Sequence, residues 1–172
     1  MSNQYISYRL YGVCCRVLGL KFSKNYIMDE CIFKTKLANV LIQVEDKSVI
    51  QICFTKRKIK LSNNPHLINA KKQVIEYIKG KRKIFTLKLN PKGTSYQKKV
   101  WKELQKIPYG QSVYYSSVAE KIQSSPRAVG NACGANKCLL VIPCHRVIAK
   151  NYNNNSVFSG LIDKNLLLKL EI

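Results

Sequence analysis

The sequence predicts an α+β fold in which a small antiparallel sheet with one helix is followed by a mainly helical part. Two runs of β-forming residues, 39–44 and 49–54, flank the polar residues 45–48, which is typical of a hairpin. An amphipathic stretch comes next, and helix signals dominate the chain after residue 93. We expect a domain of residues 1–90 and a second domain of residues 91–172.

The first half also carries signals for a helix and a further strand. Apolar residues between Leu67 and Ile78 fall on one helical face, while Pro65 suits a first turn and Gly80 suits a C-terminal cap. These positions predict a helix between the proline and the glycine. Residues 84–89 then form a short apolar run, for which we predict another strand.

Three helices are predicted in the second half. Thr94 and Gln97 have the spacing of a capping box at the start of the first helix. A shorter helix over 116–122 is followed by a break at 123–125 and a third helix from 126 to about 136. Two helices with so short a connection suggest a helix-turn-helix, which reads DNA, although most short helix pairs only form core.

The third of these helices is poor in bulky side chains. Its small residues are Ala128, Gly130, Ala132, Gly134 and Ala135. Small residues let a backbone approach another surface closely, so the helix either packs tightly inside the protein or lies against a nucleic-acid groove. In the second interpretation Arg127, at the start of the helix, is the cation that projects toward the nucleic acid.

Charge and cysteine usage narrow the classes of partner and compartment. The formal net charge is +21, with eighteen basic and five acidic residues in 1–90 and twelve and four in 91–172. This excess favours nucleic acid as the partner over an anionic membrane. No signal-peptide pattern precedes the seven cysteines and no apolar run approaches the roughly 18 residues of a membrane span, so we expect a soluble, cytoplasmic protein with reduced thiols.

The segment Pro143-Cys144-His145-Arg146-Val147 is the strongest signal for chemistry. It follows the apolar run 139–142, which we interpret as the end of a buried strand. A cysteine beside a histidine can have its ionisation controlled, and the thiolate is the reactive form of cysteine. Cys144 is therefore a candidate nucleophile, and the alternative is a small buried hydrophobic residue.

Several motifs together resemble a known family. They are Gly93-Thr94-x-x-Gln97-x-x-Val100-Trp101, Ile107-Pro108-x-Gly110, Arg127-Ala128-Val129-Gly130, Asn136 and Pro143-Cys144-His145-Arg146-Val147. In this order they resemble the O6-alkylguanine-DNA alkyltransferases, also called methylated-DNA–protein-cysteine methyltransferases. The match covers residues 92–171, and the first half resembles the ribonuclease H-like sheet of that family in general character only.

The resemblance implies direct-reversal repair of DNA. Such a protein transfers an alkyl group, chiefly methyl, from O6 of guanine in double-stranded DNA to its own cysteine in one irreversible step. O4 of thymine is a possible second substrate. The family binds the minor groove through a helix-turn-helix and flips the damaged nucleotide out of the stack. The resemblance implies no cofactor, and we expect a monomer.

The resemblance also implies roles for single residues. Cys144 is the alkyl acceptor, activated through a water by His145, which Glu171 orients; a frayed terminal charge is the alternative for Glu171. Tyr115 donates a proton to the departing guanine and turns against the flipped phosphate. Arg127 fills the space that the base leaves, and Asn136 ties the helix-turn-helix to the cysteine loop.

Further contacts are implied for the DNA and for the substrate pocket. We expect Ala128 and Gly130 of the small-residue helix to contact the DNA together with Arg127 and Tyr115. The expected pocket residues are Val147, Val157, Phe158, Ser159 and Gly160.

Some members of the family carry zinc in the first half of the chain. In this sequence the ligand atoms there would come from Cys14, Cys15, Cys31, Cys53 and His66. Two adjacent cysteines, with no Cys-x-x-Cys pair in the chain, are poorly spaced for a tetrahedral zinc site, so we predict no metal.

Two other functions stay open at this point. A cysteine hydrolase could use Cys144 and His145 with turnover, but it leaves the small-residue helix, Arg127 and the charge unexplained. A non-catalytic DNA binder could share the scaffold, although it would not need Cys144.

Overall fold

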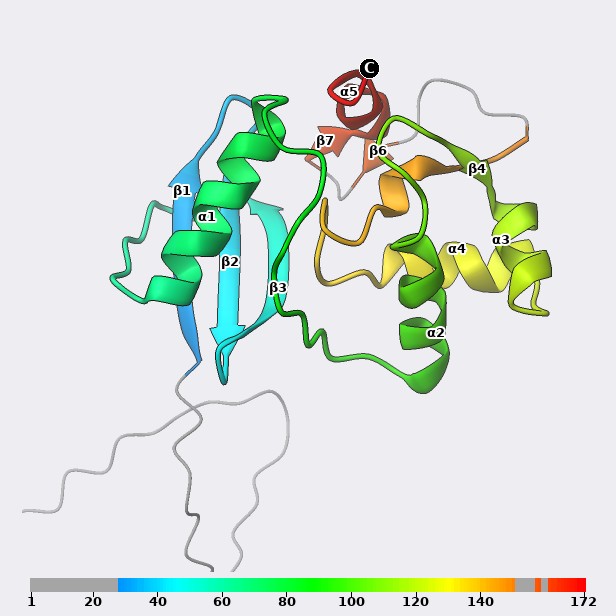
Figure 1. The fold of residues 1–172 in the computed structure, drawn as a ribbon, viewed down its shortest axis with the longest axis horizontal. Helices are drawn as coiled ribbons and strands as arrows, with labels where there is room; N and C mark the ends of the chain where they lie inside the picture. Colours follow the sequence, from blue (N-terminus) through cyan, green and yellow to red (C-terminus); the bar gives the residue numbers. More distant parts are fainter. Residues whose placement is uncertain (1–27, 151–156, 159–160) are drawn as a thin grey trace, which may run out of the picture.

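Residues 28–150, 157–158 and 161–172 are described by a computed structural model, and they form two parts that lie side by side (Figure 1). The first part is an antiparallel sheet with one helix, and the second is mainly helical. The predicted α+β class is therefore confirmed. Within the described ranges, no helix has the length and apolar character needed to cross a bilayer.

The sheet has three strands in the order β1-β2-β3, all antiparallel. They are β1 (Asp29–Lys34), β2 (Asn39–Glu45) and β3 (Ser48–Thr55). The tight turn between β2 and β3 places Asp46 and Lys47 at positive φ values of 47° and 62°. This confirms the predicted hairpin, and β1 is an additional strand that the sequence analysis did not identify.

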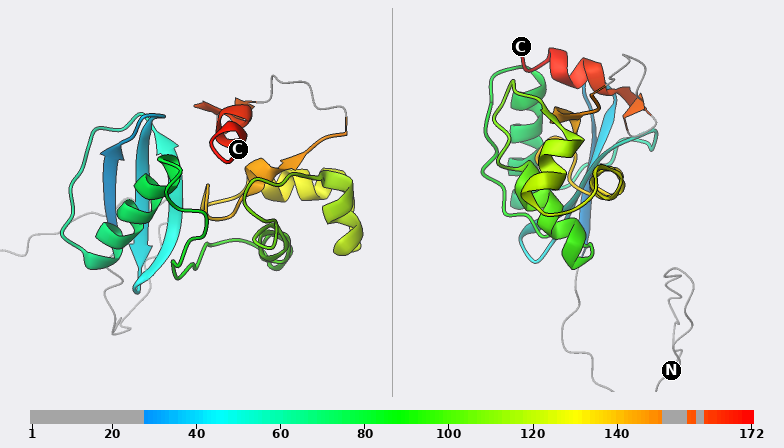
Figure 2. Two further views of the ribbon diagram at one scale, coloured as in Figure 1. Left: turned by 45° about the horizontal axis from the view of Figure 1, so that its top comes forward. Right: turned by 90° about the vertical axis from the view of Figure 1, so that its right-hand side faces the viewer.

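Helix α1 (Pro65–Ile78) lies across one face of the sheet (Figure 2). Asn64 caps it by accepting a 2.8 Å hydrogen bond from the backbone N–H of His66, and Pro65 occupies the first turn, where no backbone donor is required. Gly80 follows the helix at φ 74°, a conformation that favours glycine. The predicted helix is confirmed with both of its end signals.

The predicted strand over residues 84–89 is wrong. Only Leu89 makes a strand-like bridge, to Val49 of β3. Earlier in the segment, the backbone N–H of Thr86 donates a 2.9 Å hydrogen bond to the side-chain oxygen of Gln73 on α1. A helix side chain thus takes the place of a strand neighbour, and β propensity alone could not reveal that partner.

The second part contains the three predicted helices. They are α2 (Ser95–Leu104), α3 (Tyr115–Lys121) and α4 (Pro126–Gly134). Thr94 and Gln97 form the capping box of α2, with hydrogen bonds of 3.2 and 2.9 Å. Gln123, at φ 54°, makes the break between α3 and α4, which pack against each other. Helix α4 ends at Gly134, two residues before the predicted end.

Short elements complete the chain around the cysteine motif. A 3₁₀ turn, η1 (Cys144–Arg146), leads into β5 (Val147–Ile148), which pairs in parallel with β4 (Val113–Tyr114). Strand β6 (Val157–Phe158) pairs with β7 (Ile162–Asp163), and α5 (Lys164–Lys169) precedes the C-terminus. Helix α5 packs on η1, so the end of the chain lies beside the cysteine.

The run 139–142 is not the buried strand that we predicted. It is a series of turns in which Leu140 has φ 70° and the N–H of Ile142 bonds the carbonyl of Cys138 at 2.9 Å. The run is still largely buried, because it lies against β3. There the N–H of Leu139 donates to the carbonyl of Ile52, also at 2.9 Å. Its apolar character therefore reflects docking against the edge of the sheet and not strand formation.

Gly93 gives a test of the packing at the start of the second part. A Cβ atom at this position would lie 2.5 Å from the ring of Trp101, whose own N–H bonds the carbonyl of Ala132 on α4 at 2.8 Å. We expect Gly93→Ala to lower the free energy of unfolding by about 1–3 kcal/mol, because the held ring cannot retreat. Denaturant unfolding should show this loss. Gly134→Ala is the control, because a Cβ there meets no atom within 4 Å; an equal loss in both variants would contradict the proposed clash.

Candidate active site

Cys144 lies at the start of η1, with only 3% of its surface exposed. Its sulfur accepts a 2.9 Å hydrogen bond from the side-chain amide of Asn136, just beyond α4. The same amide group donates to the carbonyl of Ile142 at 2.8 Å, and its oxygen accepts from the N–H of Cys138 at 2.9 Å. Asn136 therefore holds both ends of the 138–142 turn and contacts the thiol as well.

The surroundings of Cys144 favour the neutral thiol. Burial raises the pKa of Cys144, while the hydrogen bond from Asn136 and the positive charge of Lys164 oppose that rise. Burial likewise lowers the pKa of His145, which is fully buried, although the contact with Glu171 opposes this shift. The resting site therefore holds a protonated cysteine and a neutral histidine, so a reaction at sulfur must include removal of a proton.

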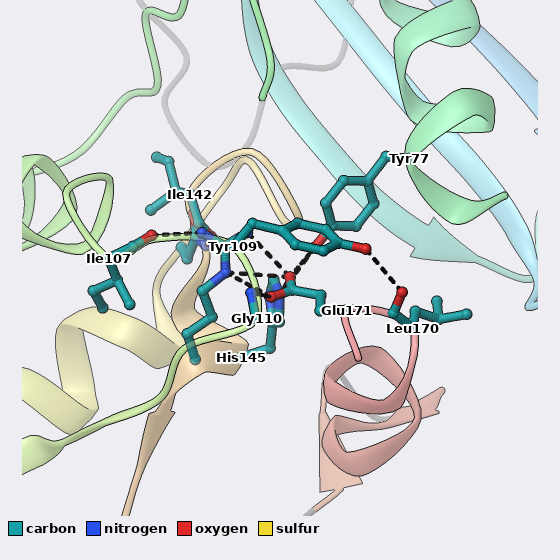
Figure 3. A network of polar contacts seen from close by, with 10 residues as sticks. Tyr77, Ile107, Tyr109, Gly110, Ile142, His145, Leu170 and Glu171 are labelled. Carbon is teal, nitrogen blue, oxygen red and sulfur yellow. Dashed lines mark hydrogen bonds and ion pairs between the residues drawn. The ribbon is translucent and has the colours of Figure 1, made fainter. Parts of the chain in front are cut away.

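The side-chain carboxylate of Glu171 lies in the interior and is not a frayed charge. Its Oε1 atom is 2.6 Å from Nε2 of His145 and also accepts a hydrogen bond from the hydroxyl of Tyr77 (Figure 3). Arg146 reaches both carboxylate oxygens, with its closest contact at 3.0 Å, and the N–H of Gly110 donates to Oε2 at 2.9 Å. Residues far apart in the sequence thus converge on one carboxylate.

These contacts determine the ionisation of Glu171. Burial alone would raise the pKa of this carboxyl group, but hydrogen bonds from His145, Arg146, Tyr77 and Gly110 lower the pKa to about 2. The group is consequently an anion at neutral pH. Arg146 also donates to the carbonyl of Ile107 at 2.6 Å, which ties the loop after α2 to the same cluster.

Lys164 is a site residue that the sequence analysis missed. Its side chain is buried, its ammonium group donates to the carbonyl of Val147, and it lies 3.5 Å from the hydroxyl and 5.3 Å from the ring centre of Tyr115. Burial lowers the pKa of Lys164. A lysine in a chain with this many lysines gives no sequence signal of burial, since lysine is usually exposed.

The helix pair brings the predicted DNA-contacting residues together. Tyr115 begins α3, Arg127 lies exposed in the first turn of α4, and Ala128 follows it. Tyr115, Arg127 and Gly130 line one cavity of about 510 Å³. A Cβ on Gly130 would meet only the Tyr115 ring, at an ordinary 3.9 Å, so packing inside the protein does not require this glycine.

The predicted pocket wall is described only in part. Val147 is buried, and its carbonyl accepts the Lys164 hydrogen bond. Val157 and Phe158 form β6, whereas Ser159 and Gly160 lie outside the described residues. Of the possible zinc ligands, Cys14 and Cys15 also lie outside them. Among the residues that are described, no three His, Cys, Asp or Glu side chains gather as a metal site would require.

Comparisons with known proteins show what the chain is similar to. The family model described as "6-O-methylguanine DNA methyltransferase, DNA binding domain" matches residues 95–172. The methylated-DNA–protein-cysteine methyltransferase of Methanosarcina acetivorans is 36% identical over 149 residues, which cover 81% of this chain and 96% of that protein.

Solved structures show the same fold. The O6-methylguanine methyltransferase of Mycobacterium tuberculosis has a TM-score of 0.74 at 27% identity, covering 84% of this chain and 93% of that one. The M. tuberculosis OGT protein in complex with DNA has a TM-score of 0.71, also at 27% identity, covering 81% and 90% of the two chains.

The fold and the site define a DNA-binding protein whose helix pair adjoins a buried cysteine and a histidine–glutamate pair. The sequence identity of 36% to the Methanosarcina acetivorans protein, over 81% of this chain and 96% of that one, makes the assignment more specific. The chain belongs to the methylated-DNA–protein-cysteine methyltransferase family.

The ionisation of Glu171 predicts how stability depends on pH. The pKa of Glu171 is about 2 in the folded protein, against an ordinary value of 4.5. Its contribution to the free energy of unfolding is therefore fully present above pH 4.5 and is lost as the pH falls toward 2. We expect Glu171→Gln to flatten this part of the stability–pH curve, measured by denaturant unfolding at a series of pH values.

Glu30 provides the control for that measurement. The exposed partner Arg57 lowers the pKa of Glu30 to about 2 as well, so Glu30→Gln should remove a smaller contribution that added salt screens. An unchanged acid slope in Glu171→Gln would contradict the assigned ionisation.

Proposed function

We propose that this protein repairs DNA by transferring a methyl group from O6 of guanine to the sulfur of Cys144, with O4 of thymine as a candidate second substrate. The observation that carries the proposal is the contact between Asn136 and Cys144. Through this contact, the residue just beyond α4, one of the two helices of the expected helix-turn-helix, lies 2.9 Å from the sulfur of Cys144. A protein that binds DNA through α3 and α4 would thus have its buried thiol next to the helix pair that contacts the DNA.

The proposed reaction balances as a single displacement. The sulfur forms a bond to the methyl carbon, the bond between that carbon and O6 breaks, and its electron pair stays on the base. The thiol proton passes through a water to His145, and the base regains a proton from the hydroxyl of Tyr115. His145 then releases its added proton to water and Tyr115 regains one from water, so both side chains end as they began. Because Nε2 of His145 is engaged by Glu171, the nitrogen that accepts the thiol proton is Nδ1.

The proposed product is a thioether, which makes the step irreversible. A thioether cannot be hydrolysed by a histidine and a water as a thioester can. Each molecule therefore acts once, which distinguishes it from the cysteine hydrolase considered above. A burst of one methyl group per protein without further turnover separates the two.

The substrate is proposed to be double-stranded DNA with the damaged nucleotide turned out of the helix. Arg127 supports this proposal because it projects from the first turn of α4 at the cavity that Tyr115 also lines. An arginine in this place can occupy the space that the base leaves. The groups named here all belong to one chain, so we propose that a monomer suffices. We also propose that the protein acts in the cytoplasm.

Cys144→Ala tests the acceptor. We expect it to abolish transfer, because a methyl side chain offers no lone pair to attack the substrate. Intact mass after exposure to methylated DNA should show a gain of one methylene unit on the Cys144 peptide of the wild-type protein and none in the variant. Cys133→Ala is the matched control, since Cys133 is also buried and burial raises its pKa to about 12. Methyl transfer that survives in Cys144→Ala would rule out the assigned acceptor.

Arg127→Ala tests nucleotide flipping. We expect transfer from duplex DNA to slow by tenfold or more, since flipping costs a few kcal/mol and the arginine offsets part of that cost. Transfer from the free methylated base, which needs no flipping, should keep its rate. Arg57→Ala removes one positive charge from the sheet part and controls for general attraction to DNA. Equal losses on both substrates would contradict the flipping role.

A further inference from the structure

We propose that Tyr77, a residue of helix α1 in the first part of the chain, is a positioning residue for the reactive histidine. The proposal deepens the function proposed above and rests on it. It concerns the proton that His145 carries on its ring, and therefore which ring nitrogen can take the proton of the thiol.

The side chain of Tyr77 crosses from one part of the molecule to the other. It belongs to the buried face of α1, with 1% of its surface exposed, yet its hydroxyl ends in the cluster around Glu171 (Figure 3). The hydroxyl donates to Oε1 of Glu171, and its oxygen lies 3.2 Å from Nε2 of His145. Along the chain, Glu171 lies 94 positions from Tyr77 and His145 lies 68 positions from it.

This geometry selects one form of the neutral imidazole. The single hydroxyl proton of Tyr77 is directed to the carboxylate, so its oxygen presents lone pairs toward Nε2. The ionised carboxylate of Glu171 can only accept hydrogen bonds as well. Nε2 therefore faces two acceptors and must carry the ring proton, which leaves Nδ1 as the basic nitrogen.

The hydroxyl of Tyr77 is suited to remain a donor. Burial and the hydrogen bond to Glu171 both raise the pKa of Tyr77 far above the working range, so the group stays protonated. The ring is fixed by Phe85, at 5.0 Å between ring centres, and by the edge of Tyr109, at 5.9 Å. A phenylalanine could fill the same space, so packing alone does not require the hydroxyl.

The test compares wild-type protein with Tyr77→Phe. The chain has two histidines, so nuclear magnetic resonance of the ring nitrogens can be assigned with His66→Gln as the reference. We expect His145 in the wild type to carry its proton on Nε2, with slow exchange of that proton with water. In Tyr77→Phe, Glu171 remains as one acceptor for Nε2, so we expect faster exchange of that proton, a larger minor population of the other ring form and transfer about tenfold slower at saturating DNA, with DNA affinity unchanged.

Tyr109→Phe is the matched control. Its hydroxyl donates to the carbonyl of Leu170 at 2.9 Å and so anchors the same end of the chain through the backbone. We expect it to lower stability without changing the His145 ring form or the transfer rate. If Tyr77→Phe and Tyr109→Phe slow transfer in proportion to their loss of stability, or if the His145 signals are unchanged in Tyr77→Phe, the positioning role is wrong.

The two proposals fail in different ways. A wild-type protein that transfers no methyl group would contradict the proposed function, yet the ring form of His145 would still be measurable. A wild-type protein that transfers methyl groups, with a Tyr77→Phe variant as fast and with the same ring form, would contradict the role of Tyr77 alone.

Discussion

The buried carboxylate of Glu171 is the group on which the arrangement of the reactive half depends. An ion in the interior costs several kcal/mol unless donors replace the water that it has lost. Here the donors come from α1, from the loop after α2 and from η1. Because those segments are distant in the sequence, satisfying one carboxylate fixes the position of each of them relative to the C-terminus.

The two ionisable groups of the proposed reaction, Cys144 and His145, are both buried. Burial shifts the pKa of Cys144 upward and that of His145 downward, so both are neutral at rest. A protonated thiol is a poor nucleophile and resists oxidation. For a protein proposed to act once, a resting state of low reactivity protects the sulfur until a substrate arrives, and the oriented imidazole then provides the base.

Local signals in the sequence predicted local structure. The hairpin, the proline and glycine at the two ends of α1, the capping box of α2 and the break before α4 each depend on residues within a few positions, and the structure has all of them. The errors share one cause, which is contact with a distant segment. Residues 84–89 bond to Gln73 and residues 139–142 dock on Ile52, so neither needs to be a strand. The burial of Lys164 and the reach of Tyr77 likewise depend on partners that spacing does not reveal.

The contacts that cross between the two parts bear on the division that we propose near residue 90. Ile52 donates a backbone hydrogen bond to Lys137 and accepts one from Leu139, and Tyr77 enters the cluster around Glu171. Two of these contacts are backbone bonds, which any sequence could make, but the third depends on a particular hydroxyl. The sheet part therefore does more than support the helical part mechanically. It contributes a polar group to the surroundings of His145, and the reactive half lacks that group when taken alone.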